Sequence, residues 1–157
     1  MVSADLGPMK IMHPENWPVT LPEKQGEFVT IAPEAGIAKD GVGYGVLLNG
    51  APAPAQRMTI DDMTAALIKQ IGQSNQLEQL SKSQPITVGK IEGRSTPLRS
   101  ASPFPDANGQ PMAEKDVLVT VPMRDGSLVY MIFVAPEADF ARLQPTFEAM
   151  LNSVQFK

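Results

Sequence analysis

Two runs of apolar residues near the C-terminal end carry the clearest strand pattern of the chain. The run 116–121 places three valines on one face, and the run 128–135 has apolar side chains on both faces. Asp125 and Gly126 between them are typical of a two-residue turn. The pattern predicts a β-hairpin whose second strand is central in a sheet and covered on both sides.

Shorter runs, rich in β-branched or aromatic residues, predict further strands separated by turns that contain Gly or Pro. These strands are expected over residues 10–13, 27–32, 44–49, 84–90, 93–101 and 154–156. The segment 102–113, rich in Pro, Asp, Asn and Gly, is expected to be a loop. Because most connections are short, the strands favour an antiparallel sheet.

Helical spacing of apolar residues appears in two places. The first helix is expected to begin after Thr59, a natural N-cap, with Asp62 adding negative charge to its first turn. Its apolar residues recur at helical intervals: Ile60, Met63, Leu67 and Ile71. A second helix is expected over 138–153, with Phe147 central in its apolar stripe. Pro145 falls inside it, so either a separate turn precedes a helix that begins at Pro145, or the helix kinks there.

The order of elements is strands, helix, strands, helix, which predicts an α+β fold with helices packed on an antiparallel sheet. A length of 157 residues fits one domain with a sizeable core. We expect residues 1–9 to be a flexible leader and residues 10–157 to form this single domain.

Charge and composition narrow the classes of function. The chain has 13 basic and 17 acidic residues, a net charge of -4, and its basic residues are scattered. A nucleic-acid-binding surface needs a clustered basic face, so we expect no nucleic-acid partner. No apolar run approaches the ~20 residues of a transmembrane helix. Residues 1–10 lack the basic start and apolar stretch of a signal peptide. A piece cut from a longer precursor would lack them as well, so this absence leaves the cellular location open.

Residue counting also limits the chemistry. The chain has no cysteine and one histidine, His13, whereas a catalytic zinc site usually needs a further histidine or a cysteine. It has no Gly-x-Ser-x-Gly motif to present a serine nucleophile. The glycines of 41–45 precede a strand, whereas a phosphate-binding loop precedes a helix. We therefore predict no catalytic, cofactor-binding or metal-binding residues, and no enzymatic activity.

Two groups of acidic residues have structural interpretations. Asp61 and Asp62 belong to the first turn of the first helix, where they complement its dipole. The segment 106–109 resembles the start of a calcium loop, but Val117 stands where that loop needs a bidentate glutamate. A plain turn is therefore expected at 106–109.

The only tryptophan, Trp17, lies in a Pro-flanked turn close to His13 and Asn16. An exposed tryptophan in a turn is typical of a recognition site, so these three residues are the candidate interaction surface. The large ring can equally plug the end of the sheet, and we favour this arrangement for Trp17, since rings of this size are usually mostly buried.

Several strings of the sequence occur together in a known pattern. They lie at residues 13–17 (His-Pro-Glu-Asn-Trp), 29–36 (Val-Thr-Ile-Ala-Pro-Glu-Ala-Gly), 44–46, 93–98, 125–127, 133–137 and 145–154. Together they resemble the C-terminal domain of bacterial zinc metallopeptidases of the M48 (Ste24-like) family. That domain is similar to the PsbP/Mog1-like fold, an α/β/α sandwich with helices packed on both faces of an antiparallel sheet.

The resemblance implies a non-catalytic accessory or protein-interaction module, because the peptidase motif His-Glu-x-x-His is absent from this chain. It implies an extracytoplasmic location, periplasmic or secreted. The implied partner is a metallopeptidase domain of the same parent chain, or the substrates of that domain.

Two alternative functions remain open. A hydrolase built on Asp or Glu residues predicts a deep pocket in which several carboxylates converge. A carrier of a small ligand or lipid predicts a large apolar cavity lined by Met and Leu side chains.

Overall fold

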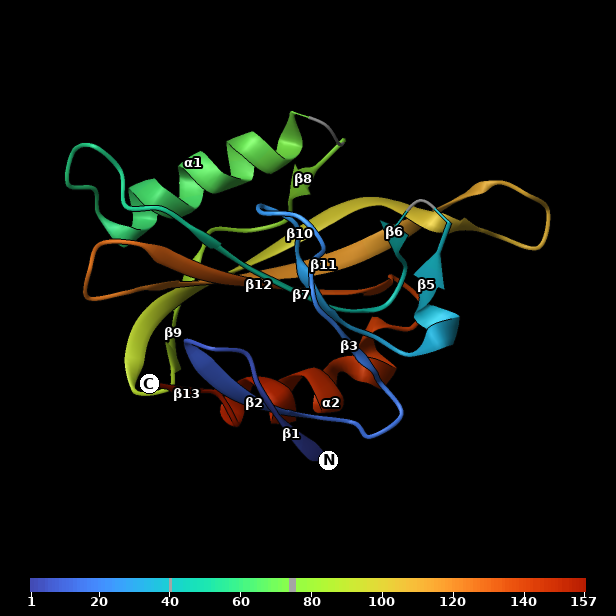
Figure 1. Ribbon diagram of the computed structural model, residues 1–157. Coiled ribbons are helices and arrows are strands. Elements are labelled where there is room, and N and C mark those ends of the chain that lie inside the picture. The colour runs from blue at the N-terminus through green and yellow to red at the C-terminus, as the bar shows by residue number, and fades with distance from the viewer. Residues whose placement is uncertain (40, 74–75) are drawn as a thin grey trace.

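The computed structural model describes residues 1–39, 41–73 and 76–157, whose strands form three antiparallel sheets (Figure 1). The largest sheet has the order β3 (Val19–Thr20), β4 (Val29–Ile31), β7 (Gly45–Ala51), β12 (Leu128–Pro136), β11 (Pro111–Pro122), β10 (Ile91–Pro105) and β8 (Glu78–Gln79), and β9 (Gln84–Val88) also pairs with β10. The smaller sheets join β1 (Val2–Asp5), β2 (Met9–His13) and β13 (Gln155–Phe156), and β5 (Ile37–Ala38) with β6 (Gly41–Val42). The helices are α1 (Ile60–Gly72) and α2 (Phe140–Asn152), and a 3₁₀ turn, Glu34–Gly36, precedes β5. The predicted antiparallel sheet with two helices is confirmed.

Strand β12 lies in the middle of the largest sheet and separates two groups of buried side chains. Its even-numbered residues, such as Ile132, pack in one group with Leu67 of α1. Its odd-numbered residues, such as Phe133, pack in the other group with Phe147 of α2. Successive side chains of a strand point to opposite faces, and Figure 1 shows α1 and α2 on opposite sides of the sheet. The apolar run on both faces of this strand is explained by these two groups.

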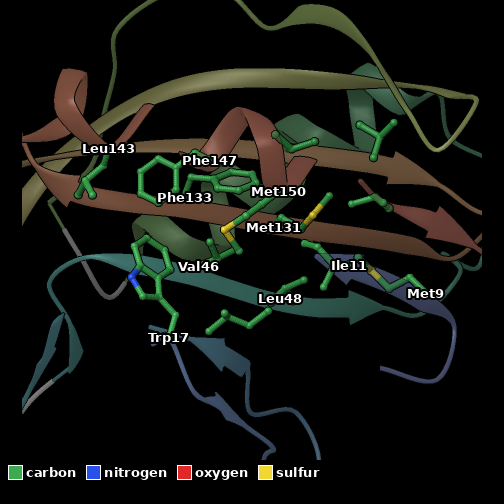
Figure 2. Packing of buried hydrophobic residues seen from close by; sticks show 14 of the residues in the cluster. Met9, Ile11, Trp17, Val46, Leu48, Met131, Phe133, Leu143, Phe147 and Met150 are labelled. Carbon is green, nitrogen blue, oxygen red and sulfur yellow. The ribbon is translucent and has the colours of Figure 1, made fainter. Parts of the chain in front are cut away.

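The larger group gathers aromatic and methionine side chains beneath α2. Figure 2 shows Phe147 and Met150 of α2 pointing toward Phe133 and Met131 of β12. The ring centroids of Phe133 and Phe147 lie 5.4 Å apart, and Met131 and Met150 have no exposed surface. Burial of this apolar surface is the main stabilising contribution of α2 to the fold.

Helix α1 begins where its sequence predicts. The Thr59 hydroxyl accepts a hydrogen bond from the Asp62 amide at 3.1 Å, so Thr59 is the N-cap. One turn later, the hydroxyls of Thr64 and Thr120 lie 2.7 Å apart, and both residues are buried. This hydrogen bond joins α1 to β11 inside an otherwise apolar interface.

Helix α2 runs through Pro145 as one element, Phe140–Asn152. Of the two arrangements that the sequence leaves open, a separate turn before Pro145 is therefore wrong. Pro145 has no N–H to donate to the carbonyl four residues before it, so the helix lacks one internal hydrogen bond. The buried stripe of Phe140, Leu143, Phe147 and Met150 spans both sides of the proline and holds the two parts against the sheet.

The first residues of the chain form a strand, and this corrects the expected flexible leader at 1–9. Strand β1 pairs with β2 in register from Val2 opposite His13 to Asp5 opposite Lys10. Gly7, with a φ of 92°, makes the turn between them, and its amide donates to Asp5 Oδ1 at 3.0 Å. The hairpin with β2 and the ion pair between Lys157 Nζ and Asp5, at 2.6 Å, hold this segment in place.

Strands β10 and β11 are longer than predicted, and the expected loop at 102–113 is wrong except at its centre. The turn is confined to 106–110, where the Gly109 amide donates to the Asp106 carbonyl at 3.0 Å. Ser100 pairs with Glu114 and Ala101 with Ala113, and the register shifts only between Ala101 and Pro105. Cross-strand pairing thus extends through a segment whose prolines and polar residues favour a loop.

Candidate functional site

A cavity of about 410 Å³ lies on the α1 side of the largest sheet, beside the C-terminal end of α1. Its apolar walls come from Phe28, Leu47, Ile71, Leu77, Ile132 and Val134. Its polar surface includes Ser100 of β10 and two acidic residues of β11, Glu114 and Asp116. The volume falls within the range of small-ligand sites, roughly 300–1,000 Å³.

The sheet register brings the three polar residues together. Glu114 and Asp116 are two residues apart on β11, so both point to the α1 face, and Ser100 stands directly opposite Glu114. Ser100 Oγ lies 3.1 Å from Glu114 Oε2 and 3.0 Å from Asp116 Oδ2. A serine hydroxyl has one proton and can donate to only one of these oxygens at a time. The other carboxyl must carry a proton if both contacts are to be hydrogen bonds.

Burial makes this acid pair energetically costly. Glu114 is 7% exposed and Asp116 is 6% exposed. When both groups are ionised, Glu114 Oε1 and Asp116 Oδ1 have no hydrogen-bond donor among the described residues. Burying an unpaired charge is far more unfavourable than burying a neutral carboxyl, so a shared proton or an outside donor is needed.

The pKa of both carboxyls is raised. Burial is the main cause that raises the pKa of Glu114 to about 9, and the hydrogen bond and the charge of Asp116 act in the same direction. Burial also raises the pKa of Asp116, against the opposing effect of hydrogen bonds from Glu114 and Ser100. The pair therefore keeps at least one proton near neutral pH.

No basic side chain of the described residues lines this cavity. The nearby Arg99 on β10 pairs instead with Glu137, at 3.0 Å, and Arg94 pairs with Asp61, at 2.8 Å. The acid pair thus lacks a counter-charge in the part of the chain that the structure describes. It can bind a cation or exchange a proton, and these are the two chemistries this arrangement offers.

The three residues of the predicted interaction surface have different surroundings. Trp17 is 6% exposed, and its ring centroid lies 6.0 Å from that of Phe147 and 6.4 Å from that of Tyr44. Figure 2 shows its indole beside Val46 and below Phe147 of α2. His13 is also 6% exposed, and its Nδ1 lies 2.9 Å from the Pro14 carbonyl, to which it donates as the protonated nitrogen.

The structure therefore places Trp17 and His13 in the core and not on an exposed face. Burial of its large apolar ring against Tyr44 and Phe147 stabilises this inward arrangement of the turn. Only Asn16 of the three is exposed, and its role as a contact stays a prediction.

The sequence analysis missed Glu114 and Asp116 as site residues. Glu114 lay between the expected loop, 102–113, and the expected strand, and Asp116 stood at the start of that strand. The signal was present in the alternation of Glu114, Asp116, Leu118 and Thr120, all buried in the sheet. Two acidic residues in phase with a buried apolar stripe indicate a buried acid pair once the expected strand is extended by two residues, from 116 back to 114.

The other acidic residues behave as expected. Asp61 and Asp62 lie in the first turn of α1, and Asp106 Oδ1 accepts from the Asn108 and Gln110 amides at 2.8 Å in a plain turn. Among residues 1–39, 41–73 and 76–157, no three acidic or histidine side chains gather as a group able to hold a metal ion. Within the same residues, no helix has both the length and the apolar character needed to cross a membrane.

Comparison with known proteins bears on the fold. No family model matches the chain, and no curated protein matches it. The solution structure of cyanobacterial PsbP (CyanoP) from Synechocystis sp. PCC 6803 is similar, with a TM-score of 0.68 and 12% sequence identity. The similarity covers 96% of this chain and 87% of that chain. The predicted PsbP-like fold is confirmed.

A second solved structure is also similar, with a lower TM-score. LpqN of Mycobacterium tuberculosis, described as involved in cell envelope biogenesis, has a TM-score of 0.53 and 10% sequence identity. The similarity covers 99% of this chain and 90% of that chain. At these identities the two similarities concern the fold alone.

Proposed function

We propose that this chain is a non-catalytic accessory module that binds a protein partner outside the cytoplasm. The observation that carries the proposal is the similarity in fold, over nearly the whole chain, to CyanoP and to LpqN, a protein involved in cell envelope biogenesis. In the finer form of the proposal, the fold is a PsbP/Mog1-like α/β/α sandwich with α1 and α2 packed on its two faces. Such a sandwich offers broad surfaces to a partner without needing a reactive centre.

In its specific form, the proposal makes this chain the C-terminal domain of an exported zinc metallopeptidase. The sequence strings at 13–17, 29–36 and 145–154 support this form, since they resemble that domain. The peptidase motif would then lie in another part of the parent chain. The partner would be the peptidase domain itself or one of its substrates.

The contact is proposed to include the turn at Asn16. This residue is exposed, whereas Trp17 behind it is held by Tyr44 and Phe147. A turn fixed by a buried aromatic anchor presents its exposed side chain with little loss of conformational freedom on binding.

The test is affinity capture from an envelope fraction with three baits: the native chain, Asn16→Arg and Asn108→Arg. Asn108 is a matched control, because it is also an exposed asparagine in a turn, in the segment 106–110. We expect the native chain and Asn108→Arg to capture the same protein, and Asn16→Arg to capture about tenfold less of it. Equal capture by the two variants would contradict the Asn16 surface, and a parent gene without His-Glu-x-x-His would contradict the peptidase form.

One observation favours a second candidate function, acid–base hydrolysis at Glu114 and Asp116. Two neighbouring carboxyls in a cavity that hold a proton between them are an arrangement that general acid and base catalysis uses. A screen with nitrophenyl esters and glycosides, comparing the native chain with Glu114→Gln, tests it. Turnover that disappears in Glu114→Gln would replace the accessory proposal with an enzymatic one.

A further inference from the structure

The cavity beside the end of α1 contains acceptors that no described residue satisfies. Glu114 Oε1 and Asp116 Oδ1 belong to side chains that are more than nine-tenths buried and that line the cavity. Natural folds seldom leave buried polar atoms without a partner, because each such atom costs free energy on folding. The partner is therefore expected to come from a proton held by the pair or from a ligand in the cavity.

The charge of the site selects the ligand. The described lining residues include two acidic side chains and no lysine, arginine or histidine, so an anion would be repelled. A cation in this low-dielectric position gains more from a carboxylate than it would in water. The ligand is therefore a cation or carries a cationic group.

The number and type of donor atoms argue against a metal ion. Calcium needs six to eight oxygen ligands and magnesium a near-octahedral set. The cavity offers two carboxyls and the Ser100 hydroxyl, and no described group of three acidic or histidine residues could hold a metal. An ammonium group has three N–H donors and no acceptor, which suits two free carboxyl oxygens and a serine oxygen.

The walls of the cavity define the rest of the ligand. Phe28, Leu47, Ile71, Leu77, Ile132 and Val134 surround the acidic spot with hydrocarbon. A volume of about 410 Å³ accepts an aliphatic stem. The stem would be buried against these side chains while the ammonium group reaches the acid pair.

We propose that this cavity binds a primary ammonium group on a short aliphatic stem, with Glu114 and Asp116 as its acceptors and Ser100 holding the two carboxyls together. The ammonium can belong to a free alkylamine or to the side chain of a lysine in another protein. Both sources present the same chemistry to the pocket. This site lies on the α1 face, and its existence does not depend on a contact at Asn16.

The test uses the native chain and isothermal titration calorimetry with n-hexylamine, n-hexanol, a Gly-Lys-Gly peptide blocked at both ends, and calcium chloride. We expect n-hexylamine to bind with one-to-one stoichiometry and n-hexanol to bind about tenfold more weakly or not at all, since it lacks the charge. Binding of the blocked peptide at least as tight as that of n-hexylamine would assign the natural source to a protein lysine, and weaker binding would assign it to a free amine.

Three variants locate the site. Glu114→Gln and Asp116→Asn keep the shape of the side chains, and each is expected to weaken n-hexylamine binding about tenfold. Glu15→Gln removes a carboxyl group at an exposed position outside the cavity and is expected to leave the affinity unchanged. If a variant fails to fold, chemical-shift changes of the native chain on adding n-hexylamine locate the site, and they are expected at Ser100, Glu114 and Asp116.

Three results would overturn the proposal. No binding of n-hexylamine or of the peptide would show that the shared proton alone satisfies the pair. Calcium binding without amine binding would show that the acceptors serve a metal. Equal loss of affinity in Glu15→Gln and Glu114→Gln, or chemical-shift changes confined to residues outside the cavity, would show that net charge or another surface binds the amine.

Discussion

Glu114 and Asp116 differ from the other acidic residues of the chain because the sheet encloses them. The folded state raises the pKa of Glu114 from 4.5 to about 9, chiefly by burial. The folded protein therefore holds a proton between these pH values that the unfolded chain releases. The corresponding stability is complete below pH 4.5 and is lost as the pH rises through about 9.

We predict that the melting temperature of the native chain decreases as the pH is raised from 5 to 9.5. The melting temperature of Glu114→Gln is expected to decrease much less over the same range. The described lining of the cavity contains no other titrating side chain besides Asp116. A loss of about 2 kcal/mol would lower the melting temperature by roughly 4–8 °C in a chain of this size. Thermal unfolding followed by circular dichroism across this pH range measures the effect. Glu15→Gln is the control, and identical pH profiles of the native chain and Glu114→Gln would contradict the prediction.

Trp17 lies in a turn, where the sequence allows either exposure or burial, and the structure buries it, which is the arrangement that the size of its ring favours. Because it packs against Tyr44 and Phe147, Trp17→Ala is expected to lower the free energy of unfolding by about 3–5 kcal/mol. The neighbouring Asn16→Ala is expected to change it by less than about 0.5 kcal/mol. Urea denaturation measures both values. A small effect of Trp17→Ala would mean that the indole is not part of the core.

At the scale of elements, α1 is joined to the sheet by one buried polar contact. The hydroxyls of Thr64 and Thr120, 2.7 Å apart, are surrounded by apolar side chains of α1, β11 and β12. The Thr120 hydroxyl also donates to the Arg94 carbonyl, at 3.5 Å, and accepts from Thr64, so removing Thr120 leaves the Thr64 hydroxyl without this partner in the interior. The energetic role of this contact is therefore visible only when both residues are changed.

We predict that Thr120→Val destabilises the protein by about 1–3 kcal/mol and that Thr64→Val destabilises it less, because the Thr120 hydroxyl keeps the Arg94 carbonyl, whereas the double variant is closer to the native chain than Thr120→Val is. Valine has nearly the shape of threonine, so the cavity volume changes little. A double-mutant cycle from urea denaturation gives the coupling energy. Effects that simply add would show that the two hydroxyls do not depend on each other.

The sequence predicted α1 better than the β10–β11 hairpin, and the reason is physical. Helix α1 is specified locally, by the Thr59 cap and by apolar residues one turn apart. The ends of β10 and β11 are specified by their pairing with each other and by the burial of their α1 face. Composition in 102–113 favours a loop, and only the partner strand overrides that preference.

At the scale of the whole molecule, the sheet divides the buried side chains into two groups that belong to different helices. Phe147 of α2 is 4% exposed in one group, and Leu67 of α1 is 6% exposed in the other. The strands between them keep these side chains apart. Each helix therefore contributes its own share of the stability.

We predict that Phe147→Ala costs about 3–5 kcal/mol and Leu67→Ala about 2–5 kcal/mol. The double variant is expected to lose the sum of the two, within about 0.5 kcal/mol, because the sites share no contact. Urea denaturation of the three variants measures this. A loss below about 1 kcal/mol for Phe147→Ala would contradict the placement of its side chain, and strong non-additivity would contradict two separate groups.

The sequence by itself determined the class of fold. Period-two alternation, helical spacing, the Thr59 cap and the Asp125-Gly126 turn are local properties, because each depends on neighbours within a few residues. The resemblance in sequence strings agreed with the PsbP-like fold found by comparison of structures. Local patterns of this kind also identified β12 as a central strand.

Only the tertiary structure decided the site. The acid pair exists because β10 lies beside β11 in one register, which sets Ser100 opposite Glu114 and encloses Asp116. The same holds for Trp17, whose burial depends on Tyr44 and Phe147, far away in the sequence. Burial and pKa depend on which distant segments cover a residue, and a sequence pattern contains only the residue and its near neighbours.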